Sequence, residues 1–122
     1  MAASPPRLVD LVVAVPWLAA VPSDIAEFLD RSEYVLPSGD IDAARRHLEW
    51  SLTANVMTYR RHREGPHTGP YQLCRLLAPA TLGTDGLLEI RQAEDRFRDV
   101  LFCAYARPLR FNEEAREVGR DR

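Results

Sequence analysis

The chain has 122 residues, of which 46% are apolar and 28% are charged, and its net charge is −2. These values are typical of one globular domain, and a chain of this size can bury a core without disulfides or a structural metal ion. The small net charge excludes a strong overall field for nucleic acid or anionic membranes, so either function would need a local basic patch.

The first part of the chain predicts two helices and a short extended piece. Apolar residues recur at helical spacing over 8–15, and Pro16 ends or kinks this helix. A second helix is expected to begin at Ser23 or Asp24. Residues 34–36 form the extended piece, and the Pro, Ser and Gly that follow break the chain.

The longest expected helix begins at Asp40 and continues past Tyr59 into the arginines that follow. Its apolar positions recur every three or four residues through roughly six turns. These positions are Ile41, Ala44, Leu48, Leu52, Val56 and Tyr59. Leu52 lies in the middle of this stripe, so we expect it to be almost fully buried.

Two further helices are expected in the second half of the chain. The fourth covers Tyr71–Leu77. The fifth opens at Thr84 or Asp85, has its apolar residues from Leu87 on, and runs to about Ala106, where Pro108 stops it. Strand-like alternation is scarce throughout. The sequence therefore predicts an all-α bundle of about five helices over residues 1–110, followed by a short C-terminal helix or disordered tail over 111–122.

The cysteines and the apolar segments indicate the cellular compartment in which the protein is expected. Cys74 and Cys103 both lie in apolar helical patterns, which favours buried, reduced thiols. The apolar run near the N-terminus is short and contains Asp10, so it does not predict a membrane span or a signal sequence. We expect a cytoplasmic protein without a membrane role.

No pattern of residues predicts catalysis. His47, His62 and His67 lack the spacing of a zinc site, and glycine-rich nucleotide loops and nucleophile motifs are missing. We therefore expect a non-enzymatic protein with no catalytic, cofactor-binding or metal-binding residues. An enzyme with a pocket inside the bundle, using His47 or Glu49 as acid or base, is an alternative.

Three large side chains lie off or at the edge of the apolar stripes of their helices. These are Trp17, Trp50 and Met57. Trp and Met are favoured at surfaces that bind partner proteins, but in a small bundle they can also fill the core from a second side. Both interpretations stay open, and a protein partner or self-association follows from the first.

A basic cluster, Arg60, Arg61 and Arg63, falls in the last turn of the expected long helix. Cations there complement the helix dipole. Basic residues beside an aromatic ring can also bind phosphate and stack on bases, which makes a small nucleic-acid-binding regulator the alternative function. All 16 basic residues are Arg, which is typical of GC-rich genomes and predicts an actinomycete-like bacterial source.

The segment Arg7–Pro16 resembles the first helix of the bacterial effector-associated domains, which are death-domain-like adaptor modules. The expected long helix from Ala43 to Tyr59, a Gly/Pro loop and the short helix at Leu73–Leu77 are similar to that family in outline. Residues 17–36 and the long fifth helix depart from it. The resemblance implies a non-catalytic helical protein–protein interaction module, an adaptor or regulatory subunit of bacterial conflict signalling.

Overall fold

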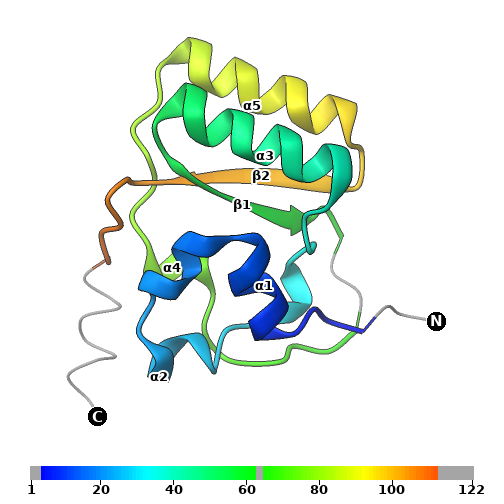
Figure 1. Cartoon of the computed structure of the whole chain (residues 1–122), viewed down its shortest axis with the longest axis vertical. Coiled ribbons are helices and arrows are strands. Elements are labelled where there is room, and N and C mark those ends of the chain that lie inside the picture. The colour runs from blue at the N-terminus through cyan, green and yellow to red at the C-terminus, as the bar shows by residue number, and fades with distance from the viewer. Residues whose placement is uncertain (1–3, 63–64, 113–122) are drawn as a thin grey trace.

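The computed structural model describes residues 4–62 and 65–112, and it shows a small antiparallel sheet with helices on both of its faces (Figure 1). Two short 3-10 helices, η1 and η2, join the α-helices of the N-terminal part. The elements are α1 (Leu8–Ala14), η1 (Pro16–Ala20), α2 (Ser23–Ala26), η2 (Arg31–Glu33), α3 (Gly39–Leu52), β1 (Asn55–Arg60), α4 (Leu73–Leu76), α5 (Thr84–Arg96) and β2 (Val100–Tyr105).

The sheet pairs β1 with β2 in antiparallel register, from Asn55 opposite Tyr105 to Arg60 opposite Val100. Single-residue bridges extend it at both edges, where Tyr34 pairs with Tyr59 and Pro79 with Tyr105. The predicted extended piece at 34–36 therefore lies beside β1.

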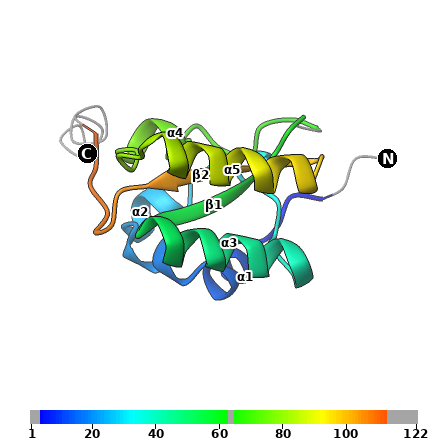
Figure 2. The same ribbon diagram turned by 90° about the horizontal axis from the view of Figure 1, so that it is seen from above.

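Alternate side chains of the strands enter two separate cores. Val56, Val100 and Phe102 pack with Leu48 beneath α3 and α5. These two helices cover one face of the sheet, and we call them the outer layer. Met57, Tyr59 and Tyr105 point to the opposite face and pack against the N-terminal helices and α4. These helices are called the inner layer, and the core between them and the sheet is called the inner core. Figure 2 shows α3 and α5 side by side over the sheet.

The prediction of an all-α bundle is wrong, because a mixed α/β fold replaces it. The expected long helix ends at Leu52, where Thr53 adopts the left-handed conformation with φ 49° and the chain turns into β1. Residues 55–59 are buried on both faces of the sheet, so the strand shows no alternation of apolar and polar residues. Its apolar residues therefore also match helical spacing.

The expected fifth helix is likewise a shorter helix followed by a strand. It ends at Arg96, and the chain turns through residues 97–99 into β2. The fourth helix is only one turn long. Leu52, expected to be almost fully buried, is half-buried at the end of α3.

The end of the described chain also differs from the predicted C-terminal helix. Phe111 is bridged to Leu77, and the Asn112 backbone N–H donates to the carbonyl of Leu76 at 2.9 Å. These two residues are therefore extended and tied to α4. The remainder of the predicted tail, 113–122, lies outside the described residues.

Candidate functional site

Trp50 is the most exposed large apolar side chain of the outer layer. It projects from α3 with 78% of its surface exposed. Its ring lies next to the imidazole of His47, one helical turn earlier, with ring centroids 6.0 Å apart. Trp50 was predicted as a partner-binding residue, and the structure places it at the surface.

A groove of about 340 Å³ runs between α3 and α5, and its lining includes His47, the ring neighbour of Trp50. Its lining combines small or apolar side chains with four polar ones. The apolar lining is Ala43, Ala44, Leu48, Ala93 and Phe97, and the polar lining is His47, Glu89, Gln92 and Arg96. Two of the polar side chains are already engaged, because Glu89 accepts a hydrogen bond from Ser51 at 2.8 Å and Arg96 lies over the ring of Phe97. We call Trp50, His47 and this groove the α3–α5 face.

The other two large side chains that the sequence singled out lie elsewhere. Met57 is fully buried in the inner core, so its interpretation as a partner-binding residue is wrong. Trp17 is half-buried, its indole N–H donates to the carbonyl of Val56 at 3.3 Å, and its ring meets the edge of Tyr105. Both side chains fill the core from a second side.

The arginines of the basic cluster do not lie at a helix terminus. Arg60 is the last residue of β1, and Arg61 follows it. The Arg61 side chain donates from Nε to the carbonyl of Arg98 at 2.6 Å, in a depression that Glu94 and Asp95 also line. The helix-dipole role is therefore wrong, and acidic groups lie beside Arg61. Arg63 lies outside the described residues.

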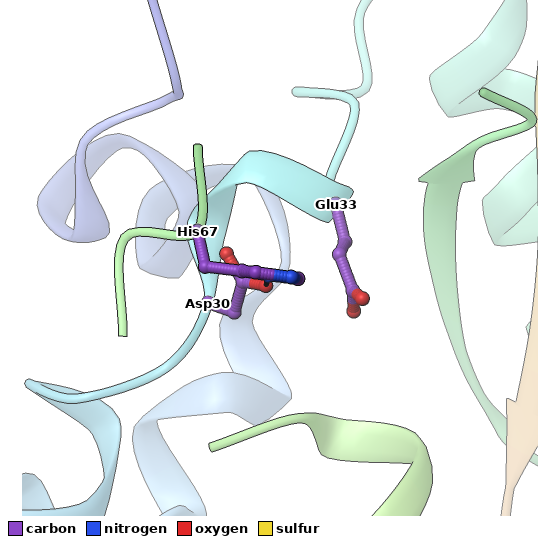
Figure 3. A group of neighbouring side chains, drawn as sticks. All are labelled: Asp30, Glu33 and His67. Carbon is purple, nitrogen blue, oxygen red and sulfur yellow. Dashed lines mark hydrogen bonds and ion pairs between the residues drawn. The ribbon is translucent and has the colours of Figure 1, made fainter. Parts of the chain in front are cut away.

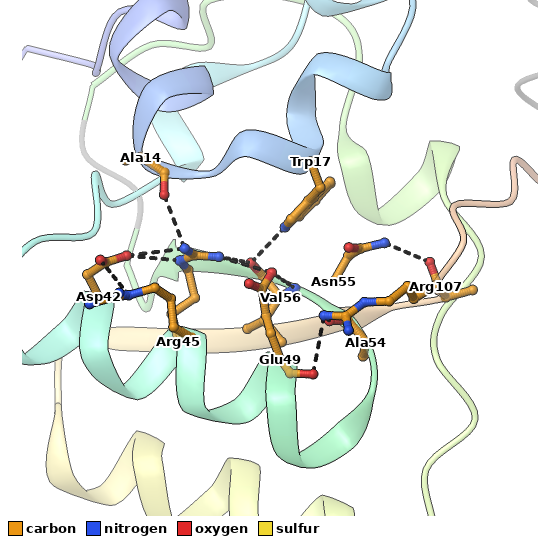
Figure 4. Close-up of polar contacts among 11 residues, drawn as sticks. Ala14, Trp17, Asp42, Arg45, Glu49, Ala54, Asn55, Val56 and Arg107 are labelled. Carbon is orange, nitrogen blue, oxygen red and sulfur yellow. Dashed lines mark hydrogen bonds and ion pairs between the residues drawn. The ribbon is translucent and has the colours of Figure 1, made fainter.

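A buried ionic network joins α3 to the sheet and to α1 (Figure 4). Arg45 is 1% exposed and makes ion pairs with Asp42 at 3.2 Å and Glu49 at 3.0 Å. It also donates to the carbonyls of Ala14 and Val56. Glu49 accepts from the Val56 backbone N–H as well, at 2.9 Å, so its carboxylate has a structural role and not that of the proposed acid or base.

A second polar cluster, Asp30, Glu33 and His67, joins η2 to the loop before α4 (Figure 3). Asp30 is fully buried, and its Oδ1 accepts hydrogen bonds from the backbone N–H groups of Ser32 at 3.3 Å and Thr68 at 3.0 Å. Its Oδ2 pairs with Nδ1 of His67. Sequence reasoning missed this cluster, because His67 comes from a loop far along the chain from Asp30.

Burial would raise the pKa of the Asp30 carboxyl. The hydrogen bonds that it accepts from Ser32, His67 and Thr68 outweigh burial and lower the pKa to about 2. A carboxyl whose pKa is lower in the folded chain stabilises the fold above its unfolded pKa of about 3.8, and this contribution is lost as the pH falls toward about 2.

We therefore expect the free energy of unfolding of the wild type to fall between about pH 4 and about pH 2 partly because Asp30 takes up a proton. Asp30→Asn removes this titrating group, so the variant should be less stable at neutral pH and lose less stability on acidification. Urea unfolding at a series of pH values measures both effects. Equal acid losses in the two proteins would show that Asp30 does not carry this dependence.

The buried tyrosines form a structural group in the inner core. The hydroxyls of Tyr59 and Tyr105 are hydrogen-bonded to each other, and the ring of Tyr34 meets that of Tyr59 edge-on. Burial raises the pKa of both Tyr59 and Tyr105 far above the usual value of a phenol. These two hydroxyls therefore stay neutral and join β1 to β2, whereas the ring of Tyr34 packs the segment before α3 against the sheet.

The two cysteines are unlinked, as the sequence predicts, but Cys74 is exposed and not buried. Burial raises the pKa of the half-buried Cys103 thiol to about 11. Partial burial and the negative charge of Glu33 also raise the pKa of Cys74. A reactive cysteine needs a lowered pKa, so neither thiol is prepared for nucleophilic catalysis.

Comparison of the chain with protein-family models, with curated proteins and with solved structures finds no match. Within residues 4–62 and 65–112, no helix has both the length and the apolar character needed to cross a membrane. The resemblance to effector-associated domains implied an all-helical fold, and the β1–β2 sheet contradicts that implication.

Proposed function

We propose that this protein is a non-enzymatic protein–protein interaction module, an adaptor or regulatory subunit, that pairs its α3–α5 face with the same face of a second copy. One observation carries the proposal. Trp50 is 78% exposed beside a groove that is lined mainly by small and apolar side chains. Trp is among the residue types that are enriched at the energetic centres of protein interfaces.

A two-fold interface needs complementary features on a single surface, because the same patch serves both copies. The α3–α5 face carries both a projecting side chain and a recess. Ala43, Ala44 and Ala93 leave room in the groove, and Trp50 projects from α3 close to His47, which lines that groove. In the proposed dimer, Trp50 of each copy enters the groove of the other.

The charges of the outer layer also favour a second copy over a partner of one charge sign. On α5, Asp85 lies at the start and Arg96 at the end, and both are exposed. A two-fold axis perpendicular to the helix places two α5 helices antiparallel, so Asp85 of one copy approaches Arg96 of the other. Opposite charges at the rim of an interface fix its register and speed up association.

A binding role fits the polar groups better than a catalytic role. Glu49 is engaged in the Arg45 network. The ring of His47 lies next to that of Trp50, and no hydrogen bond joins it to a carboxylate of the described residues. We assign the module to the cytoplasm because its two cysteines are unlinked, as is usual in a reducing compartment. Glu94 and Asp95 beside Arg61 weaken the nucleic-acid alternative.

The test is sedimentation of the wild type and of Trp50→Ala over a range of concentrations. We expect a reversible monomer–dimer equilibrium for the wild type. Removal of one interface anchor typically costs about 2 kcal/mol or more, which is about 30-fold in the dissociation constant, and each dimer of Trp50→Ala loses two anchors. The dissociation constant should therefore rise by more than about 30-fold.

Val13→Ala is the matched control. Val13 is 77% exposed, but it lies on α1 and not on the α3–α5 face. This variant should dimerise as the wild type does. A wild type that stays monomeric up to millimolar concentration, or a dimer that Val13→Ala disrupts and Trp50→Ala does not, would refute the proposal.

A further inference from the structure

Asp30, Glu33 and His67 converge from two segments that are distant in the sequence. One possible metal-binding atom of each residue lies within 4.8 Å of those of the other two. The imidazole of His67 extends between the two carboxylates (Figure 3). Two carboxylates and one imidazole are a donor set that suits zinc and related divalent transition metals.

The Asp30 carboxylate is held in a fixed orientation, with one oxygen turned to this cluster. Oδ1 accepts the backbone hydrogen bonds from Ser32 and Thr68, whereas Oδ2 faces His67. Carboxylates that bind metal ions are commonly oriented by such hydrogen bonds to their other oxygen. Glu33 has a similar support, because Gln72 donates to its Oε1 at 3.2 Å.

The charge of the cluster also favours a cation. Asp30 is an acidic residue whose side chain is fully buried. Buried charges in proteins are compensated by an opposite charge or by a metal ion. In the described part of the chain, the side chain that is ion-paired with Asp30 is His67, which is itself a metal-binding residue type.

We propose that Asp30, Glu33 and His67 bind one divalent transition metal ion of the zinc class, with water completing the coordination. The ion takes the place of the direct contact between Asp30 and His67. This site lies in the inner layer and is independent of the proposed dimer face. Because it joins η2 to the loop before α4, the bound ion should stabilise the fold.

The test uses ZnCl2 as the probe and thermal unfolding and equilibrium dialysis as readouts. We expect the wild type to bind one equivalent of Zn²⁺ and to gain about 5 °C or more in melting temperature at saturating metal. His67→Ala and Glu33→Gln should weaken binding by at least about tenfold, since each loses a ligand. His67 is more than half exposed, so His67→Ala should fold.

Two controls separate this site from other possible zinc ligands. His62→Ala removes an exposed histidine of the same loop region, and Cys74→Ser removes the exposed thiol. Both variants should bind Zn²⁺ like the wild type. The proposal fails if the wild type shows neither stoichiometric binding nor a thermal shift. It also fails if His67→Ala retains binding, or if Cys74→Ser abolishes it.

Discussion

Arg45→Met is expected to lower the free energy of unfolding by about 3–5 kcal/mol, which is the usual cost of removing one member of a buried ion pair. The Arg45 guanidinium is almost completely buried and joins two carboxylates of α3 to the carbonyls of Ala14 and Val56. Met keeps most of the apolar stem, so the loss would come from the network and not from a cavity. Urea unfolding followed by circular dichroism measures it.

The next residue offers a matched control. Arg46 also pairs with Asp42, at 3.1 Å, but its side chain is 67% exposed. Exposed ion pairs contribute little, so Arg46→Met should cost less than about 1 kcal/mol. If the two variants were equally stable, the network would not be what joins α1, α3 and β1.

Gly69→Ala is expected to destabilise the protein by about 2–3 kcal/mol, because there is no room for a side chain at this position. A Cβ at Gly69 would lie 2.3 Å from the carbonyl oxygen of Phe28. That oxygen accepts the backbone N–H of Tyr71 at 3.1 Å, and the Asp30 N–H donates to the Tyr71 carbonyl at 2.7 Å. The two segments would have to separate and lose these hydrogen bonds.

Gly83→Ala is the control for this variant. A Cβ at Gly83 meets no atom within 4 Å, and its φ of −80° is accessible to any residue. Gly83 is the N-cap of α5, where Ala is less favourable than Gly, but Ala also lowers the entropy of the unfolded chain. Gly83→Ala should therefore cost no more than about 1 kcal/mol, less than Gly69→Ala. Thermal unfolding compares both variants with the wild type, and equal melting temperatures for Gly69→Ala and the wild type would contradict the close contact.

The sequence predicts where some helices and strands end better than it predicts the strands themselves. Pro16 ends α1 and Pro108 follows β2, as the positions of these prolines suggest. The helix-to-strand turn at Thr53 contains neither Gly nor Pro, so nothing in the sequence marks the end of α3. The strand that follows is buried on both faces, and a short apolar segment of this kind cannot be distinguished from a buried helix by periodicity.

The candidate site residues were also predicted correctly on a helix and incorrectly on a strand. The off-stripe position of Trp50 correctly placed it at the surface, because α3 is a true helix. The same argument failed for Met57, which lies on a strand. Asp30 and His67 were not predicted to meet, since only the folded chain brings η2 next to the loop before α4. One local signal was present: Ser32 lies two residues after Asp30, at the spacing at which an Asp side chain accepts a hydrogen bond from the backbone N–H.

The proposed dimer and the proposed metal site can be tested separately because they lie on different layers. Trp50 projects from α3 in the outer layer, whereas His67 contacts Asp30 beside the inner layer. His67→Ala should leave dimerisation unchanged, and Trp50→Ala should leave Zn²⁺ binding unchanged. Failure of one proposal therefore does not affect the other.

The most direct test of the central claim is the fluorescence of Trp50 as a function of protein concentration. The chain has two Trp residues, so Trp17→Phe leaves Trp50 as the single reporter. The proposed dimer predicts emission typical of a water-exposed indole in dilute solution and a shift to shorter wavelength as the concentration rises and a second copy covers Trp50. An emission maximum that stays the same from micromolar to millimolar concentration would contradict it.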